Sequence, residues 1–182
     1  PAYDLLGAKA LLKEAGYENG FSMTIDYMAD SRAKEMLQPI ADEMAKLNIK
    51  ATLNGVEQSA FFGKIMQKDT SAYVLGYFFP TQDASEVLEG VVHTPTQMLG
   101  AYNLSYSNPS LDTKIEELGK ILNQQSRQQK MQEALKLAMD DVAKIPLFQV
   151  LTYRSYDKDI YYKSRLDGTY RIQELAGKSI SK

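Results

Sequence analysis

The sequence predicts an α/β fold in which a mainly parallel sheet is flanked by helices. Three segments, 21–28, 49–56 and 72–79, have the alternating or continuously apolar character of strands, and a segment of helical periodicity follows each of them. Strands that alternate with helices in this way form parallel sheets, because each helix carries the chain back to the start of the next strand. In such sheets a ligand binds beyond the carboxyl ends of the strands, where the loops converge.

The composition is typical of a globular domain and argues against several functions. Among 182 residues, 44% are hydrophobic and 24% charged, with a net charge of -2 and no basic face that would suggest nucleic acid. No apolar run reaches the length of a membrane span, and no cysteine is present for a disulfide or a thiolate metal site. The chain begins at Pro1, which favours a processed product or a fragment of a longer protein.

The first half of the chain should contain three helices beside its strands. Residues 5–15 carry apolar side chains at helical spacing. The second helix, expected from about residue 31, contains Pro39, which should kink it or move its start later. The third helix is expected at 59–68. The strand at 72–79 is almost continuously apolar, as expected if both of its faces are covered.

The second half should be mainly helical. A helix is expected at 83–92, and another begins where Asn108 can cap it and Pro109 fits the first helical position. The buried stripe of this second helix should comprise Leu111, Ile115, Leu118 and Leu122. Further along, the sequence predicts a polar break at 123–129, a long helix at 127–144, a last core strand at 145–155 and a polar, Tyr-rich tail at 156–182 without clear periodicity.

Catalytic chemistry is poorly supported. His93 is the only histidine, and a single histidine after an apolar helix is usually structural or solvated. No Ser-His-Asp set, paired-histidine metal spacing or glycine-rich phosphate loop can be assembled, so we expect no enzyme activity, no cofactor and no metal. Three acid pairs lie on expected helices, where a solvated face is the natural interpretation: Asp42/Glu43, Glu116/Glu117 and Asp140/Asp141.

Five stretches, in order, resemble one protein family. They are "YDLLGAKALLKEAGYENGF", "IADEMAKLNIKATLNGVE", "FFGKIMQKDTSAYVLGYFF", "YSNPSLDTKIEEL" and "IPLFQVLTYR". Together they are similar to the C-terminal lobe of family 5 extracellular solute-binding proteins, the peptide- and nickel-binding receptors of ABC importers. The resemblance implies one lobe of a type II periplasmic-binding-protein-like fold. Residues 1–182 would form a single C-terminal ligand-binding lobe, with 156–182 as a tail returning toward a missing N-terminal lobe.

The resemblance also implies a function. Two lobes would close over a peptide or peptide-like small solute and deliver it to the membrane permease of an ABC importer. The location would be periplasmic or extracellular, with or without a lipid anchor. Two alternatives from other classes are a small α/β enzyme and a regulatory module that binds a partner through its Tyr-rich tail.

The family pattern G-W-x-x-D-x-x-D-P is altered in this chain. Gly76 and Tyr77 match its first two positions, but Pro80 occupies the slot of the aspartate that pairs with the peptide α-ammonium. Asp83 matches the second aspartate, and Ala84 replaces the proline. Either the ligand has no free α-ammonium here or another acid reaches it. Asp83 is the nearest acid, although the family pattern favours a helix cap at that position.

The expected ligand site comprises loops that follow the strands. At its centre, Tyr77, Phe78, Phe79 and Pro80 follow one another in the chain. This cluster is interpreted either as a wall that faces the ligand or as a cap on the core. The candidate residues are Met28, Asp30 and Ser31, then Glu57, then Tyr77, Phe79, Pro80, Thr81 and Asp83, and finally Tyr102, Asn103 and Tyr106.

Overall fold

A computed structural model describes residues 3–78, 80–81, 83–151, 153–163, 165, 167–169, 171–174 and 176–177. The chain divides into two compact units, Pro1–Gly76 and Tyr77–Lys182. Each unit is described below by itself. Phe79 lies outside the described residues.

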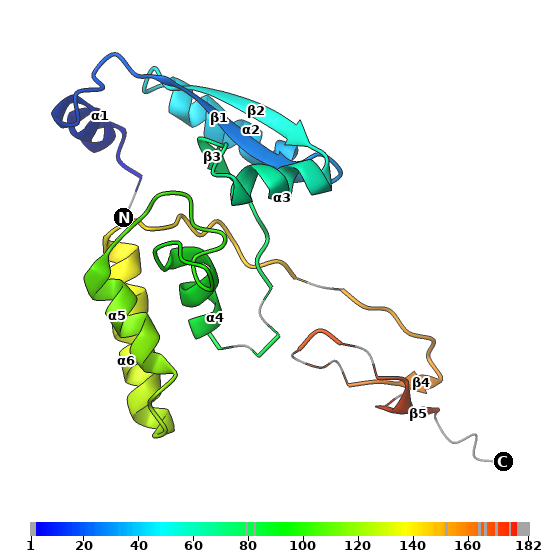
Figure 1. Ribbon diagram of the computed structural model, residues 1–182. Coiled ribbons are helices and arrows are strands. Elements are labelled where there is room, and N and C mark those ends of the chain that lie inside the picture. The colour runs from blue at the N-terminus through cyan, green and yellow to red at the C-terminus, as the bar shows by residue number, and fades with distance from the viewer. Residues whose placement is uncertain are drawn as a thin grey trace. The chain divides into compact units, whose positions relative to one another are not determined.

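The first unit contains a parallel sheet of three strands in the order β2-β1-β3. β1 (Ser22–Met28) and β2 (Lys50–Val56) pair along their whole length, with Met28 opposite Val56 at the carboxyl end. The two strands run side by side in Figure 1. This sheet confirms the predicted parallel arrangement of the three segments.

The third strand is shorter than the sequence predicts. β3 (Ala72–Tyr73) pairs with β1 opposite Ile25 and Asp26, and one further ladder bond follows, from the Val74 N–H to the Asp26 carbonyl at 3.0 Å. The prediction of a strand over 72–79 is therefore wrong for residues 74–78, where no strand is assigned, and Phe79 lies outside the described residues. After the strand has ended, Val74 packs on the β1 cluster, whereas Phe78 is 63% exposed.

The two faces of the sheet are covered by different helices (Figure 1). α2 (Ala33–Ala45) packs Leu37 against Ile25 and Tyr27, and it continues through Pro39. α3 (Gln58–Met66) buries Phe61 and Ile65 completely. Residues of β1 alternate between the two helices, as the two-residue period of a strand requires. α1 (Leu5–Glu14) precedes the sheet and is capped by Asp4, whose Oδ1 accepts from the Gly7 N–H at 2.8 Å.

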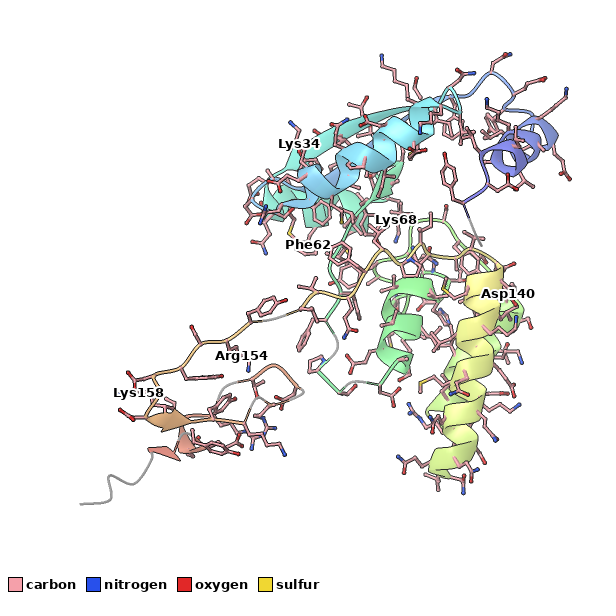
Figure 2. The ribbon with its side chains drawn as sticks, turned by 180° about the vertical axis from the view of Figure 1, so that it is seen from behind. Lys34, Phe62, Lys68, Asp140, Arg154 and Lys158 are labelled. Carbon is pink, nitrogen blue, oxygen red and sulfur yellow. The ribbon has the colours of Figure 1, made fainter. Side chains whose placement is uncertain are left out.

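The second unit is built on helices. α4 (Ser85–Val87) runs directly into a π-helix, η1 (Leu88–Val92), and together they correspond to the helix predicted at 83–92. α5 (Pro109–Leu118) begins as predicted, with the Asn108 side chain accepting from the Leu111 N–H. α5 and α6 (Gln124–Asp140) lie side by side in Figure 1, and Figure 2 shows Asp140 at the carboxyl end of α6. Their shared core consists of Leu88, Val92, Leu111, Ile115, Leu118, Ala134 and Ala138.

Two details of this helical pair differ from the predictions. α5 ends at Leu118, so Leu122 lies beyond it and is 98% exposed instead of buried. The break lies at 119–123 rather than 123–129, because Asn123 caps α6 by accepting from the Ser126 N–H at 2.9 Å. The helix therefore begins at Gln124, although the residues from 124 to 129 are polar, because the Asn123 side chain stabilises its first turn.

The predicted core strand at 145–155 is also wrong. Among its described residues no strand forms, and its apolar side chains are exposed, with Phe148 at 66% and Val150 at 70%. Figures 1 and 2 show the chain here as an extended trace. Strand propensity acts only where a neighbouring strand supplies hydrogen bonds, and none lies beside the described part of this segment. In the tail, β4 (Ile160–Tyr161) pairs antiparallel with β5 (Ala176–Gly177), after a 3-10 turn, η2 (Ile172–Glu174).

Candidate functional site

The carboxyl ends of β1 and β2 bring together the candidate residues of the first unit. The Ala29 N–H donates to the Val56 carbonyl at 2.9 Å, so the loops after both strands start at the same edge. In the first loop, the Ser31 hydroxyl donates to the Met28 carbonyl at 2.6 Å, while Asp30 is exposed. The geometry therefore groups Met28, Asp30, Ser31 and Glu57, as the sequence predicts for parallel strands.

Within this group, Glu57 is the residue that caps α3. Its Oε2 accepts from the Ser59 N–H at 2.9 Å and the Ala60 N–H at 3.3 Å, which caps the amino end of α3. The hydrogen bond from the Ser59 hydroxyl, followed by those from the backbone, lowers the pKa of Glu57. An acid that fills the first turn of a helix is satisfied before any ligand arrives.

A buried carboxylate that the sequence interpretation missed lies in the middle of the sheet. Asp26 is 1% exposed, and its Oδ1 accepts from the Asn54 amide at 2.6 Å. Its Oδ2 lies 3.5 Å from the Lys64 ammonium on α3. The available signal was a charged residue at an inward position of an otherwise apolar strand. The Asn54 and Lys64 contacts make it a structural ion pair between sheet and helix.

In the second unit, two tyrosines of the candidate set come together. The rings of Tyr77 and Tyr102 lie 5.8 Å apart between centroids at 72°, an edge-to-face pair. The Tyr77 hydroxyl donates to the Glu86 carbonyl at 3.3 Å. A Cβ at Gly90 would lie 2.6 Å from the Tyr77 hydroxyl oxygen, so any larger residue there would force this ring to shift. Burial raises the pKa of Tyr77, and the negative charges of Glu86 and Glu89 add to the shift.

The π-helix η1 holds the loop that carries Tyr102. In a π-helix the hydrogen bonds run between residues five apart, as in the bond from the His93 N–H to the Leu88 carbonyl at 2.8 Å. The carbonyls of Glu89 and Gly90 accept from the loop instead, from the Gly100 N–H at 2.7 Å and the Tyr102 N–H at 2.9 Å. These two hydrogen bonds hold the backbone of Gly100 and Tyr102 against the π-helix.

Asn103 is the second anchor of this loop. It is 0% exposed, and its amide nitrogen lies within 3.0 Å of the carbonyls of Val92, His93 and Tyr106. Its Oδ1 accepts from the Tyr106 N–H at 3.1 Å. Because its side chain is enclosed and bonded to backbone, Asn103 offers no surface to a ligand, and we remove it from the proposed contact set.

Tyr106 also makes a structural contact. Its hydroxyl donates to the Asp141 carboxylate at 2.7 Å, and the Asn108 amide donates to the same oxygen at 2.8 Å. Burial, and then this bond, raises the pKa of Tyr106. Asp141 is therefore more than part of a solvated face, because it ties the start of α5 to the end of α6.

Asp83 forms an ion pair with Arg127 of α6. Its other oxygen, Oδ1, accepts from the Ser85 N–H at 2.9 Å. Arg127 also donates to the Ser85 hydroxyl and to the Leu118 carbonyl, both at 3.2 Å. The hydrogen bond from Arg127 lowers the pKa of Asp83. The sequence interpretation missed Arg127, which sits inside the polar run taken for a break.

The loop between Tyr77 and Asp83 is held by Glu86. The Thr81 hydroxyl and the Thr81 N–H both donate to Oε1 of Glu86, the latter at 3.3 Å. Pro80, directly before Thr81, is exposed. The structure thus brings Tyr77, Thr81, Asp83 and Tyr102 into one region of the second unit, with Glu86 as a member that the sequence did not identify.

His93 has a structural environment. It is 2% exposed, with Nδ1 at 2.7 Å from the Thr94 carbonyl and Nε2 at 3.2 Å from the Glu116 carboxylate. Within the described residues, no group of three His, Asp or Glu side chains is arranged to hold a metal ion. None of the described helices combines the length and the apolar character needed to cross a membrane.

An open depression of about 360 Å³ lies in the first unit, away from the candidate loops. Its lining includes Lys9 and Lys13 of α1, with Leu47 and Asn48 from the turn before β2. That turn is at the amino end of the strand, whereas ligand-binding loops of parallel sheets follow the carboxyl ends. We therefore assign no binding role to it.

Comparison with known proteins identifies the family. The family model described as "Bacterial extracellular solute-binding proteins, family 5 Middle" matches residues 1–98. The chain belongs to this family. The matched residues include the whole first unit and, in the second unit, Tyr77, Pro80, Thr81 and Asp83, whereas Tyr102 lies beyond the match.

Curated relatives of this family 5 chain are glutathione-binding proteins named GsiB. The protein of Salmonella choleraesuis is 26% identical over 168 residues, which cover 87% of this chain and 32% of the relative. The protein of Pectobacterium atrosepticum is 28% identical over 120 residues, which cover 62% of this chain and 23% of the relative. The chain thus spans about a quarter to a third of the length of these relatives.

Solved structures of the same fold support the α/β class. OppA of Burkholderia pseudomallei is 27% identical with a TM-score of 0.68, over 78% of this chain and 28% of that protein. DppA of Helicobacter pylori, solved with the peptide STSA, is 22% identical with a TM-score of 0.69, over 78% of this chain and 28% of that protein. The fold class predicted from the sequence, an α/β fold of the periplasmic-binding-protein type with a parallel sheet flanked by helices, is confirmed by these likenesses.

Proposed function

We propose that this chain is part of an extracellular receptor that binds a peptide or peptide-like small solute and delivers it to an ABC importer. The observation that carries the proposal is the family match over residues 1–98. Relatives are named for glutathione binding, and a structural neighbour was solved with a peptide. The short span of the chain relative to these proteins supports a second, N-terminal lobe in the complete receptor.

The proposed ligand wall is the Tyr77–Tyr102 pair with the adjoining loop at Thr81. Both rings are half-buried, so part of their surface is accessible. Aromatic faces bind peptide side chains and backbone with little loss of side-chain entropy, because a tyrosine has only two side-chain torsions. The loops at Asp30 and Glu57 in the first unit remain predicted ligand contacts.

Binding to the complete receptor tests the proposal. Isothermal titration with glutathione, the dipeptide Met-Leu and the tetrapeptide Ser-Thr-Ser-Ala should give saturable binding of at least one. Tyr77→Ala should then weaken that ligand by about tenfold, the value of one well-packed aromatic contact. Tyr153→Ala, which removes a tyrosine that is 87% exposed in the segment at 145–155, is the matched control and should leave the affinity unchanged.

Two results would contradict the proposal. One is the absence of binding by every peptide and by glutathione. The other is chemical conversion of the ligand, detected by mass spectrometry after incubation, since a receptor returns its ligand unchanged. Equal losses from Tyr77→Ala and Tyr153→Ala would remove the tyrosine pair from the site while leaving the receptor function in place.

A further inference from the structure

We propose that Asn19 is a site of spontaneous chemical modification, at which the Asn19–Gly20 peptide closes to a cyclic imide and then opens to aspartate and isoaspartate. The sequence contains two Asn–Gly pairs, Asn19–Gly20 and Asn54–Gly55. The fold leaves the first pair free to react and restrains the second. Both pairs belong to the first unit, and the proposal does not depend on the function proposed above.

The reaction needs only the chain and water. The backbone nitrogen of Gly20 attacks the side-chain carbonyl carbon of Asn19, the bond from that carbon to Nδ2 breaks, and ammonia leaves with the proton of the glycine N–H. Water then opens the imide. Attack at the side-chain carbonyl gives aspartate, whereas attack at the main-chain carbonyl gives isoaspartate, in which the backbone runs through the former side chain. Glycine favours the reaction because it has no Cβ to hinder the approach and its backbone is flexible.

Asn19 lies in an exposed turn between α1 and β1 (Figure 1). Its side chain makes no hydrogen bond within the described part of the chain, so no such bond restrains the carbon that is attacked. The attacking nitrogen, that of Gly20, donates to the Tyr17 carbonyl at 2.9 Å. Backbone hydrogen bonds of exposed turns open at little cost in free energy, so this nitrogen becomes available while the sheet stays folded.

The backbone of the turn requires glycine at position 20. Its φ is +73°, and a Cβ there would lie 2.0 Å from the Asn48 carbonyl oxygen. Another residue would slow the imide reaction but would strain the turn. The reactive partner of Asn19 is therefore fixed by the fold, and only a change of residue 19 itself removes the reaction without this strain.

The second pair has the same chemistry but is held in place. Asn54 and Gly55 belong to β2 and pair with β1 opposite Asp26 and Tyr27. The Asn54 amide nitrogen, which would have to leave as ammonia, donates to Oδ1 of Asp26 at 2.6 Å. Closing the imide would also turn the Asn54 backbone out of the extended conformation that pairing with β1 requires. The sheet must therefore open before Asn54 can react.

Modification of Asn19 should weaken the start of the sheet. Isoaspartate lengthens the backbone by one carbon directly before Gly20, whose fit against Asn48 is already tight. The next bond along the chain, from the Lys50 N–H to the Phe21 carbonyl at 2.8 Å, leads into the pairing of β1 with β2. Both products also add a negative charge to a chain whose net charge is -2.

The test incubates the full 182-residue chain at neutral pH and physiological temperature and follows both pairs by peptide mapping with mass spectrometry. Far-UV circular dichroism confirms that the chain is folded. The Asn19 peptide should gain the mass that replaces an amide by an acid at least about tenfold faster than the Asn54 peptide. Part of the product should be isoaspartate, which is separated from aspartate by retention time. In guanidinium chloride the two pairs should react at closely similar rates, because each asparagine is followed by glycine.

Asn19→Gln is the matched variant, because glutamine keeps the carboxamide but closes to an imide much more slowly. It should remove the acidic form that isoelectric focusing detects in aged wild-type protein, while Asn54 reacts as before. The proposal is overturned if Asn19 stays unmodified, if the two pairs react equally in the folded chain, or if Asn19 yields aspartate without isoaspartate. It is also overturned if the tenfold difference persists in guanidinium chloride, since the neighbouring sequence and not the fold would then set the rates. Persistence of the acidic form in Asn19→Gln would assign it to another residue and overturn the proposal as well.

Discussion

Replacing Asn103 by alanine should destabilise the second unit more than any other change of a single polar side chain described here. The carboxamide is 0% exposed and serves four backbone groups: the carbonyls of Val92, His93 and Tyr106, and the Tyr106 N–H. Its amide nitrogen has only two hydrogens, so the three carbonyls share them. Removing the side chain therefore removes about three hydrogen bonds from an enclosed site.

The expected loss is about 3 kcal/mol, since a buried hydrogen bond contributes about 1 kcal/mol net, and more if the carbonyls stay dry. Urea unfolding of the 182-residue chain, followed by far-UV circular dichroism, measures the change. With a denaturant slope of about 2 kcal/mol per molar, the midpoint of the transition that includes the second unit should fall by about 1.5 M. The slope itself should not change.

Asn123→Ala is the matched control for this prediction. It removes the same side chain from an exposed helix cap, where one bond to the Ser126 N–H is lost. That change should cost about 1 kcal/mol. If Asn103→Ala costs no more than Asn123→Ala, the buried amide does not hold the loop and the reasoning fails.

Three further outcomes follow from the same structure. Arg127→Met should lower the free energy of unfolding by about 1 kcal/mol, because the pair with Asp83 is partly exposed. The pKa of Asp83 is lowered in the fold, so the stability from this pair is complete above the ordinary aspartate value of about 3.9 and is lost as the pH falls below that value and through the lowered pKa of the folded state. Asp83→Asn should remove that part of the acid sensitivity, and an unchanged pH profile would argue against the pair. Leu111→Ala, at a position that is 0% exposed, should cost about 2–5 kcal/mol, whereas Leu122→Ala, at 98% exposure, should cost under about 0.5; equal costs in urea titrations would contradict the assigned core. Gly20→Ala should lower the melting temperature in calorimetry, because φ is +73° and the added Cβ would lie 2.0 Å from a backbone oxygen; an unchanged value would show that the turn relaxes freely.

Local chemistry made part of this fold predictable. Asn108 and Pro109 marked the start of α5 because capping needs only neighbouring residues. The alternation in β1 and β2 predicted a parallel pair, since each strand was followed by a helix. The segment at 145–155 has similar local character, yet it forms no strand among its described residues. A strand needs a partner, and no local pattern reports whether one is present.

The candidate site was less predictable for a related reason. Tyr77 was named from its place at the end of a predicted strand and Tyr102 from the segment before α5, and the structure pairs their rings. Arg127 lies 44 residues from Asp83, so no periodicity links the two. Glu86 looked like an ordinary polar position of a helix, and only the folded loop brings Thr81 to its carboxylate. The joining of these residues with Asp30 and Glu57 into one face stays a prediction.

The π-helix at Leu88–Val92 has a consequence for how this segment can change in length. A π-helix is an α-helix with one residue inserted, and deleting one residue would restore the usual bonds between residues four apart. The carbonyls of Glu89 and Gly90 would then be used inside the helix and lost to the loop, which they now bind through Gly100 and Tyr102. The direction of every later side chain on the helix would also turn by about 100°. The segment should therefore accept many conservative substitutions but no single-residue deletion, so that its length is more constrained than its composition.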